Sequence, residues 1–429
     1  MIRPAPDPIP DPTQAAAAFV RQPRVVDGGP VAVVRDGRDV IVCTDAVEHV
    51  AAHGDAGLQA LDHMWAGDGF WVGALAYDLG RVIERVDIDT DTDGHTDGRP
   101  NRDDRGFAHV AFTRFATQTR FTPNSTNPES ADTPSDASHR DRALGGMASS
   151  LSRNEHAAAV AAVHHHLSAG DCYQVNLTRR LHTRRRAEPR ALFAALASRH
   201  PAPHAALVEL DGIALVSASP ERFLRVEDGA VETRPIKGTH ASAECLMASG
   251  KDLAEHVMIL DMARNDLGRV CELGSVHVPA LAALERHPGL AHLVSTVRGH
   301  LRSDASLADL VRATFPPASI TGAPKPRVMQ IIEALEPVHR GYYCGAIGWI
   351  DGAAARADLA VGIRTFVVSE RGTDLGVGGG VVADSTAAGE WDETSLKAAR
   401  LLEAAGAYEI ESGADRPARR SVATAGAPR

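Results

Sequence analysis

The sequence has few aromatic residues, few cysteines and no long uncharged hydrophobic run. Phe, Trp and Tyr make up 4% of the 429 residues, so Ala, Val, Leu and Ile must supply most of any core. Five scattered cysteines without a CxxC pair favour a reducing compartment over a disulfide framework. The chain has no apolar stretch of about 18 residues, and its proline-rich N-terminus lacks the apolar centre of a signal peptide. These absences predict a cytoplasmic protein that does not enter a membrane.

The chain also lacks an excess of positive charge. Its formal net charge is −10, whereas a nucleic-acid-binding protein usually carries a concentrated basic face. We therefore expect no nucleic-acid partner. An anionic small-molecule substrate is compatible with this charge, because its site needs only a few local cations or a metal ion.

Composition divides the chain into ordered and disordered parts. The two ends, 1–14 and 411–429, are rich in Pro, Ala, Gly, Ser and Arg and are predicted to be disordered. Residues 15–145 are expected to form an N-terminal sheet-forming region, and residues 146–410 the catalytic region. Two polar stretches without an apolar period are expected to be surface loops: 87–106 and 122–143. We expect the two regions to form one double-layered unit; a separable N-terminal domain is the alternative.

Hairpin signals predominate over a regular alternation of helices and strands. Asp-Gly pairs at 211–212, 228–229 and 351–352 separate short apolar segments. The predicted strands are 31–37, 39–45, 71–80, 172–178, 205–210, 213–218, 222–226, 230–236, 343–350, 356–368 and 374–378. The predicted helices are 153–167, 189–199, 251–267, 304–314, 323–335 and 386–405. This order predicts an α+β fold with antiparallel sheets.

One hairpin carries a possible acid and nucleophile. In SASPERFLRVEDGAVETRPIKGT (217–239), Glu221 and Lys237 stand at the two ends of the hairpin, so both side chains can reach one cavity. A carboxylic acid and an amine so placed can act as proton donor and nucleophile. From spacing alone, an exposed cross-strand ion pair is the more common outcome.

Two predicted helices each present a pair of carboxylates. Asp252 and Glu255 are spaced i, i+3, as are Glu390 and Glu393, so each pair falls on one helical face. Two such helices can build an oxygen-only site for Mg²⁺. The alternative for each helix is solvated surface charge, with Glu393 and Lys397 as an ordinary i, i+4 pair.

Two further features indicate anion binding. The segment VGGGVVADS (377–385) can present bare backbone N–H groups to an anion, or it can form a tight turn that needs positive φ. Both readings stay open from residue type alone. Arg364 lies in an apolar strand, VGIRT (361–365), and should meet a carboxylate from the protein or from a ligand.

Taken together and in order, these segments resemble the chorismate-utilising enzymes. The similarity runs from about residue 71 to residue 402. It is carried by GDCYQVNLTRR, SASPERF, RPIKGT, LAEHVMILDMARNDLGRV, LAHLVSTVRG, SITGAPKPRVMQIIEALEP, GYYCGAIGWI, GGGVVADS and WDETSLKA. The resemblance implies two large packed antiparallel sheets flanked by helices, with the active site between them.

The resemblance also implies roles for individual residues. Glu255 and Glu393 match the principal Mg²⁺ ligands, Asp252 and Glu390 match their water-mediated partners, and Glu221 matches the general acid. The groups that would hold the two carboxylates of chorismate are Arg364, Tyr343, Lys397 and the backbone at Gly378 and Gly380. The groups that would line the ring pocket are Gly238, Thr239, His292 and Ser319.

Two positions indicate a branch of this family. Lys237 resembles the lysine of the branch that aminates ring carbon 4, where it forms a covalent intermediate, whereas related branches carry a small residue there. Gln174 stands where water-using members carry a lysine base, so ammonia is the implied nucleophile. The product would be 4-amino-4-deoxychorismate, a precursor of 4-aminobenzoate and folate, with ammonia from a separate glutamine amidotransferase subunit. Component I of anthranilate synthase and a non-catalytic binding subunit are the alternatives.

Overall fold

The computed structural model describes residues 29, 31–86, 106–122, 143–210, 212–240, 244, 250–287 and 290–410. The predicted disordered ends lie outside the described residues, as do nearly all residues of the two predicted polar loops. None of the described helices is both long enough and apolar enough to cross a bilayer.

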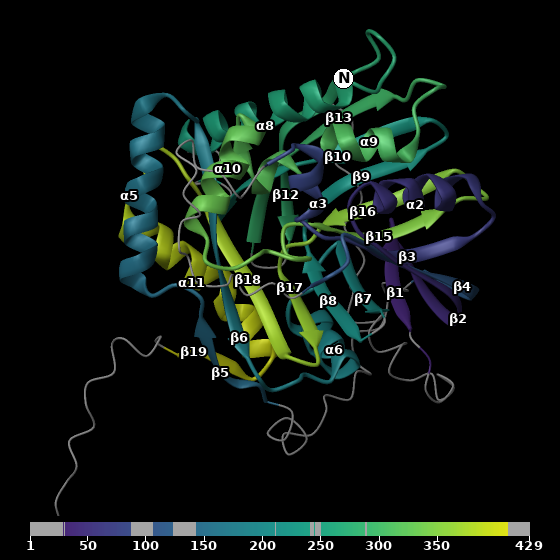
Figure 1. Ribbon diagram of the computed structural model, residues 1–429, viewed down its shortest axis with the longest axis horizontal. Helices are drawn as coiled ribbons and strands as arrows, with labels where there is room; N and C mark the ends of the chain where they lie inside the picture. Colours follow the sequence, from purple (N-terminus) through teal and green to yellow (C-terminus); the bar gives the residue numbers. More distant parts are fainter. Residues whose placement is uncertain are drawn as a thin grey trace, which may run out of the picture.

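The described strands form one continuous hydrogen-bonded run that doubles back on itself (Figure 1). Its first half contains, in spatial order, β19 (Ala407–Ile410), β5 (Gly145–Ser149), β6 (Gln174–Thr183), β18 (Gly372–Val381), β17 (Thr365–Ser369), β8 (Ile213–Ser219), β7 (His204–Leu210) and β1 (Ala32–Asp36). Its second half contains β2 (Asp39–Ala52), β4 (Val110–Phe121), β3 (Phe70–Leu75), β15 (Ala346–Asp351), β16 (Arg356–Val361), β9 (Arg222–Glu227), β10 (Ala230–Arg234), β13 (Leu290–His300) and β12 (His277–His287). Two short strands, β11 (Ile236–His240) and β14 (Gly322–Ala323), pair with β13 and β6. All these pairings are antiparallel except β19 with β5.

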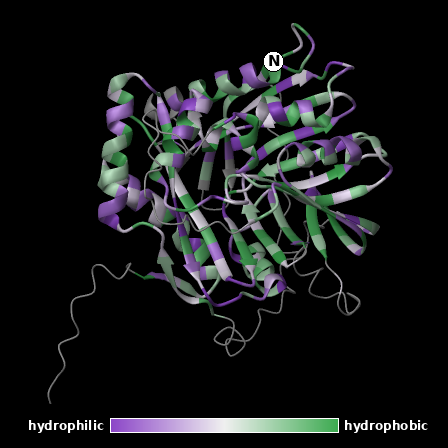
Figure 2. Ribbon diagram, viewed as in Figure 1, coloured by the Kyte–Doolittle hydropathy of each residue, from purple (hydrophilic) through white to green (hydrophobic). Residues whose placement is uncertain are grey.

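The two halves pack face to face around an apolar core. Side chains of β7, β8 and β17 share one buried cluster with side chains of β3 and β15. Phe70 of β3 stacks on Trp349 of β15, with ring centroids 5.5 Å apart. β3 is buried along its whole length, as expected for a strand covered on both faces. Figure 2 shows hydrophobic residues concentrated along the strands, whereas the outer helix α5 carries both kinds.

The helices cover the outer faces of these layers. Their bounds are α2 (Gly54–Ala66), α3 (Leu79–Ile83), α5 (Arg153–Ala169), α6 (Pro189–Arg199), α8 (Gly250–Gly268), α9 (Leu307–Thr314), α10 (Lys325–Leu335) and α11 (Ala387–Ala404), with a short 3₁₀ turn at Ala318–Ile320. α11 packs on β18 and on α5, whereas α8 packs on β11 and β13. Ser152 and Glu155 form a capping box at the start of α5.

One predicted strand is wrong as a single element. Residues 356–368 form two strands, because β16 pairs with β9 in one layer whereas β17 pairs with β8 in the other. The chain therefore crosses between the layers at residues 362–364. Arg364 adopts a φ of 51° at this crossing. The predicted strand 71–80 likewise ends at Leu75, where the chain turns into α3.

The N-terminal strands β1, β2, β4 and β3 form one block of the run, with strands from later in the chain on both sides. β1 pairs with β7, and β3 pairs with β15. The boundary expected between residues 145 and 146 stays a prediction.

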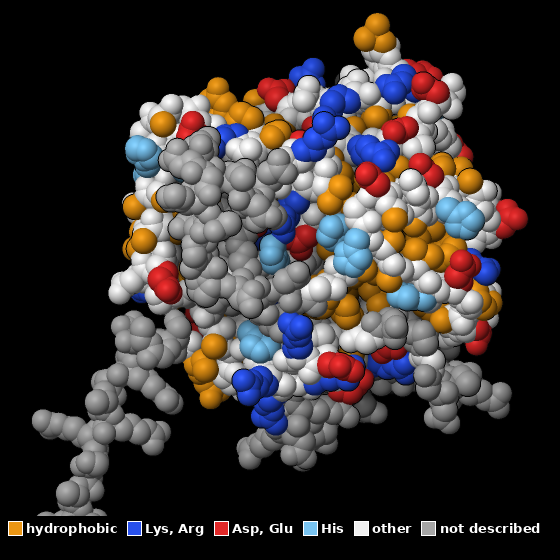
Figure 3. Space-filling model, in the orientation of Figure 1, with side chains coloured by type: hydrophobic (Ala, Val, Ile, Leu, Met, Phe, Trp, Pro, Cys, Tyr) orange, Lys and Arg blue, Asp and Glu red, His pale blue; other side chains and the backbone are white. Residues whose placement is uncertain are grey.

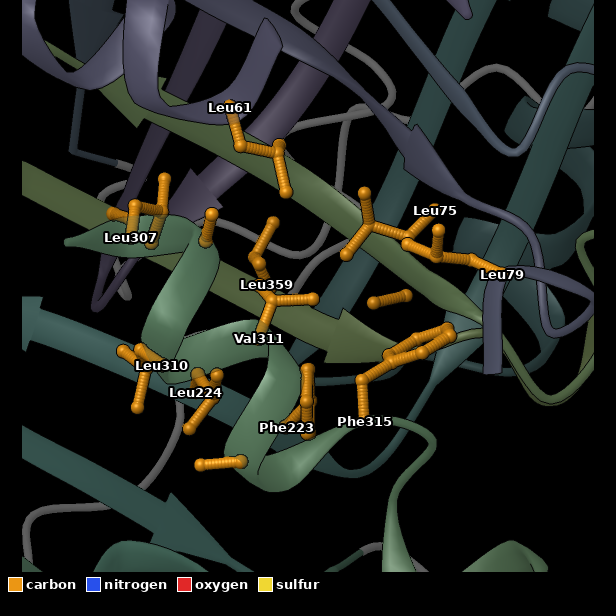
Figure 4. Close-up of a cluster of buried hydrophobic side chains, with 14 of the residues drawn as sticks. Leu61, Leu75, Leu79, Phe223, Leu224, Leu307, Leu310, Val311, Phe315 and Leu359 are labelled. Carbon is orange, nitrogen blue, oxygen red and sulfur yellow. The ribbon is translucent and has the colours of Figure 1, made fainter. Parts of the chain in front are cut away.

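A second apolar cluster anchors the strand that begins next to Glu221. Phe223 and Leu224 of β9 lie among side chains of α9 and β16, with Phe315 edge-on to Phe223 at a centroid distance of 5.8 Å (Figure 4). Since these residues are buried, the start of β9 has little freedom to move. This packing fixes the backbone that carries Glu221.

Candidate active site

Glu221 lies at the point where β8 gives way to β9. Its side chain is only 5% exposed. Its backbone carbonyl accepts a hydrogen bond from Val361 N at 2.9 Å, and its backbone N–H donates to Ser219 Oγ at 3.3 Å. A cavity with an empty volume of about 370 Å³ adjoins Glu221 and is lined also by Ser319, Pro317 and side chains of α8.

The surroundings of Glu221 favour its protonated form. Burial raises the pKa of this carboxyl to about 7, against the opposing effects of the nearby Ser319 hydroxyl and of the charge of Lys237. The N–H of Ile236 and the more distant charge of Arg364 also favour the ionised form but do not outweigh burial. At neutral pH the group therefore has a proton to donate.

Lys237, Gln174 and Gly380 meet although they lie on three different strands. Lys237 is on β11, Gln174 begins β6, and Gly380 is on β18. A Cβ atom added to Gly380 would lie 2.7 Å from Gln174 Nε2 and 3.5 Å from Lys237 Nζ. Both polar atoms of the Gln174 amide are buried and have no hydrogen-bond partner among the described residues. A buried primary amide without partners is typical of a site that a polar ligand completes.

The environment of Lys237 favours the neutral amine. Burial lowers the pKa of Lys237 below its usual value, and the charge of Lys397 acts in the same direction. The carboxylates Glu255, Glu221 and Glu393 oppose this shift. A neutral amine is the form that can act as a nucleophile.

The register of β11 is irregular at this point. Lys237 pairs with Leu293 and Thr239 pairs with His292, and Gly238 lies between them with a φ of 74°. Only glycine adopts this backbone conformation without strain. The predicted ring-pocket residues Gly238, Thr239 and His292 therefore adjoin Lys237, and His292 is 3% exposed.

The carboxylates of α11 face the glycine-rich part of β18. A Cβ atom added to Gly379 would lie 2.9 Å from Glu390 Oε2 and 3.5 Å from Glu393 Oε1. Ser385 Oγ donates to Glu390 Oε1 at 2.6 Å. Lys397 Nζ lies 2.7 Å from Glu393 Oε1 and donates to the carbonyl oxygen of Gly378 at 2.8 Å. The predicted i, i+4 pair of α11 thus exists, and it also ties the helix to β18.

The glycines themselves decide between the two interpretations of this segment. Gly378, Gly379 and Gly380 lie inside the extended strand β18, opposite Thr178, Leu177 and Asn176. None of them has a positive φ. The tight-turn alternative is therefore wrong. These glycines are needed because neighbouring side chains occupy the space of a Cβ.

The four predicted metal ligands are not equally well defined. Glu255 of α8 lies within electrostatic reach of Lys237, whereas the side chain of Asp252 lies outside the described part of the chain. Among the described residues, no three His, Cys, Asp or Glu side chains form a ready-made metal site. The convergence of Glu390 and Glu393 on Gly379 supplies oxygen donors only, which is the chemistry that Mg²⁺ prefers.

Arg364 lies at the crossing between the two layers, within electrostatic reach of Glu221. Burial lowers its pKa to about 10, the negative charge of Glu221 opposes the shift, and Arg400 adds to it. Its Nη1 lies 3.4 Å from His200 Nε2. Tyr343, predicted to act with Arg364, is 8% exposed and packs against Gly376 of β18.

Sequence reasoning missed three residues that contact the predicted ones or lie near them. Ser385 holds Glu390, and His200 contacts Arg364. His256 Nε2 of α8 lies 2.5 Å from Ser295 Oγ, and burial together with the nearby charge of Lys237 lowers the pKa of this imidazole. Ser385 stands five residues before Glu390 and was accessible from the sequence. His200 and His256 were not, because their partners are far away along the chain.

Figure 3 shows one face of the molecule, on which positive and negative side chains lie close together beside histidines. Because the charges are interspersed, this face is not uniformly basic or acidic.

Comparison with known proteins identifies relatives along most of the chain. A family model described as chorismate binding enzyme matches residues 21–403. Aminodeoxychorismate synthase component 1 of Klebsiella aerogenes is 42% identical over 272 residues, which are 61% of this chain and 59% of that protein. Anthranilate synthase component 1 of Aquifex aeolicus is 39% identical over 249 residues, which are 56% of this chain and 50% of that protein. The aligned part thus spans between half and three fifths of these relatives.

Solved structures share the fold. Anthranilate synthase component I from Streptococcus pneumoniae superposes with a TM-score of 0.71 at 24% identity, covering 90% of this chain and 96% of that chain. A putative 2,3-dihydroxybenzoate-specific isochorismate synthase from Bacillus anthracis gives a TM-score of 0.69 at 20% identity, covering 92% and 99%. At these identities the likeness concerns the fold alone. It confirms the predicted α+β class with packed antiparallel sheets.

Proposed function

The chain belongs to the chorismate binding enzyme family, and we propose that within this family it aminates chorismate at ring carbon 4 to give 4-amino-4-deoxychorismate. The observation that carries this proposal is Lys237. Its amine stands beside the unpartnered amide of Gln174, and its surroundings favour the neutral form. The family resemblance associates a lysine at this position with amination at carbon 4.

The proposed reaction uses Glu221 and Lys237 in sequence. The neutral amine of Lys237 attacks ring carbon 2, both ring double bonds shift by one position, and the bond from carbon 4 to its hydroxyl breaks. Hydroxide is a poor leaving group, so protonated Glu221 donates its proton and water departs. Ammonia then attacks carbon 4, the two double bonds shift back, the bond from carbon 2 to the lysine nitrogen breaks, and the new ammonium group returns a proton to Glu221. The net change exchanges hydroxyl for amine, without oxidation or reduction.

Charged groups around the site suit a substrate with two carboxylates. We assign Arg364, Lys397, Tyr343 and the backbone at Gly378 and Gly380 to these carboxylates, and Ser319, Gly238, Thr239 and His292 to the ring pocket. We propose Mg²⁺ as the cofactor, with Glu255 and Glu393 as principal ligands and Glu390 and Asp252 as water-mediated partners. When bound, this ion would neutralise the ring carboxylate and draw electrons from the diene.

We further propose that the ammonia comes from a separate glutamine amidotransferase subunit. The designation component 1 of the relative from Klebsiella aerogenes supports a second component. Free ammonium in solution should replace that subunit in an assay, because ammonia itself is the nucleophile.

Anthranilate synthase component I stays the second candidate, since the relative from Aquifex aeolicus is nearly as similar. The two functions differ in the ring position of the new amine. Chorismate, Mg²⁺ and ammonium should yield a product that a separate lyase converts to 4-aminobenzoate. Direct appearance of anthranilate without a lyase would assign the second function instead.

The variant Lys237→Ala tests the proposed nucleophile. We expect it to bind chorismate but to lose amination at carbon 4 by at least about 10²-fold, as is usual when a covalent nucleophile is removed. Trapped turnover mixtures of the wild type should contain a substrate adduct on the peptide that carries Lys237. If wild type and variant both show only background turnover, a non-catalytic binding subunit is the correct reading.

A further inference from the structure

Arg364 is held by a neutral partner rather than by a carboxylate. Among the described residues, its one direct side-chain hydrogen bond runs from Nη1 to His200 Nε2, at 3.4 Å. No carboxylate in the described part of the chain forms an ion pair with it; Glu221 interacts with it only through longer-range electrostatics. Two buried arginines in the described part of the chain differ in this respect: Arg340 and Arg179 each form a two-pronged pair with a glutamate.

His200 is itself firmly placed. It ends α6, where its backbone N–H donates to Leu196 O at 2.7 Å. The neighbouring Arg199 donates to the carbonyl of Glu403 at 3.3 Å and so fastens the end of α6 to the end of α11. The backbone that carries this imidazole is therefore held by contacts within α6 and with α11.

The contact defines the protonation state of His200. A guanidinium has only donors, so His200 Nε2 must accept and the ring proton must be on Nδ1. Burial, together with the positive charges of Arg364 and Arg400, lowers the pKa of His200 to about 4. The ring is consequently uncharged at neutral pH.

The backbone of Arg364 is held as well. Its φ of 51° is uncommon for a residue other than glycine. Its carbonyl oxygen accepts a hydrogen bond from Ala218 N at 3.0 Å, and the next residue, Thr365, donates through Oγ1 to Ser217 Oγ at 2.9 Å. These contacts hold the backbone of Arg364, and the contact with His200 holds its guanidinium.

We propose that His200 is a positioning residue that orients the guanidinium of Arg364 toward a carboxylate of the substrate. The inference rests on the proposed function, in which Arg364 binds chorismate. A protein carboxylate in the place of His200 would also orient the guanidinium, but it would neutralise the charge and compete with the substrate. A neutral imidazole accepts one N–H, leaves the positive charge in place and leaves the other N–H groups for a two-pronged contact.

The test compares His200→Leu, which has no acceptor, with His200→Gln, whose amide oxygen can accept. We would measure the Kd of chorismate by calorimetry without ammonium, and kcat and KM with saturating ammonium and Mg²⁺. We expect His200→Leu to raise Kd and KM about tenfold with kcat changed by less than about threefold, because a hydrogen bond to a charged group is lost. His200→Gln should recover most of the affinity.

Two controls separate positioning from general damage. His277→Leu removes an exposed histidine of β12 and should leave Kd and KM unchanged. In an Arg364→Met background, His200→Leu should have no further effect on Kd, because the group it positions is absent.

Three outcomes would overturn the proposal: an unchanged Kd in His200→Leu, an equal loss in the Arg364→Met background, or a loss in His200→Gln as large as in His200→Leu. Failure of the proposed function is a different result. A wild type that binds chorismate but yields anthranilate or no product contradicts the proposed amination, while the Kd comparison still decides the role of His200.

Discussion

Replacing Glu221 with glutamine should stabilise the folded protein above neutral pH while it removes the proposed proton donor. Glutamine has nearly the same volume and its amide oxygen can accept the hydrogen bond that Ile236 N–H gives to Glu221. It cannot ionise, so the variant never places a negative charge in this buried position. An amide also cannot protonate a departing hydroxyl, and we expect kcat to fall by about 10²–10⁴-fold.

The size of the stabilisation follows from the pKa of Glu221. That pKa is about 7 in the folded protein, against an ordinary value of 4.5 in the unfolded chain. Between these values the folded state holds a proton that the unfolded state has released, so stability falls as pH rises from 4.5 to 7. The difference of about 2.5 pKa units corresponds to about 3 kcal/mol at alkaline pH. Below the unfolded value this contribution vanishes.

The assay is urea unfolding of wild type and Glu221→Gln at about pH 4 and about pH 8.5, below and above the predicted window. The two proteins should have similar free energies of unfolding at the lower pH, and the variant should exceed the wild type by up to about 3 kcal/mol at the higher pH. Glu370→Gln, at an exposed position between β17 and β18, should show no such gap. A gap that is independent of pH, or a variant that is less stable at the higher pH, would refute the assignment of a protonated, buried acid.

Two further substitutions test the site and the core. Gly379→Ala places a methyl group 2.9 Å from Glu390 Oε2 and 3.5 Å from Glu393 Oε1; it should raise the Mg²⁺ concentration needed for half-maximal activity at least about tenfold, and an unchanged Mg²⁺ titration would contradict the proposed ligands. Arg340→Met leaves the buried carboxylate of Glu336 without its cation and should lower the free energy of unfolding by about 3–5 kcal/mol. Glu336→Gln in that variant removes the unpaired charge and keeps an acceptor for Thr178, so it should restore part of the loss in urea unfolding; failure of this rescue would contradict the ion-pair explanation.

The elements that the sequence predicts well are those whose signals are local. Helix α6 has the predicted bounds, 189–199, because Glu188 caps it and Pro189 occupies its first turn. The Asp-Gly turns likewise mark the hairpins of β7 with β8 and of β15 with β16. In each case the residues that determine the structure are neighbours along the chain.

Two of the missed strands, β12 and β13, depend on distant partners. β12 and β13 have no clean alternation, since β12 contains Pro279, an alanine-rich centre and two register shifts. Their strand character comes from pairing with one another and with β10 and β11. The break at 362–364 was missed for a similar reason. Residues 356–368 form one apolar run, and only the change of partner strand, from β9 to β8, shows that the chain leaves one layer for the other.

Residue spacing predicts some features of the candidate site but not others. The i, i+3 rule correctly placed Glu390 and Glu393 on one side of α11, because helical periodicity is local. Spacing could not indicate that this side faces β18, nor that Lys237 would reach β18 from another strand. The pairing of β11 with β13, which sets the position of Lys237, joins residues more than 50 positions apart.

The three consecutive glycines of β18 belong to a family motif that indicates contacts between distant segments, which residue spacing cannot indicate. Their identity is required by three different neighbours: Thr178 beside Gly378, the α11 carboxylates beside Gly379, and Gln174 with Lys237 beside Gly380. A Cβ at any one of them would displace a different contact. The GGG motif is therefore required by three separate close contacts with one strand. The carboxylates of Glu390 and Glu393 lie beside Gly379, and the amine of Lys237 lies beside Gly380. β18 therefore connects the carboxylate side of the site to its amine side.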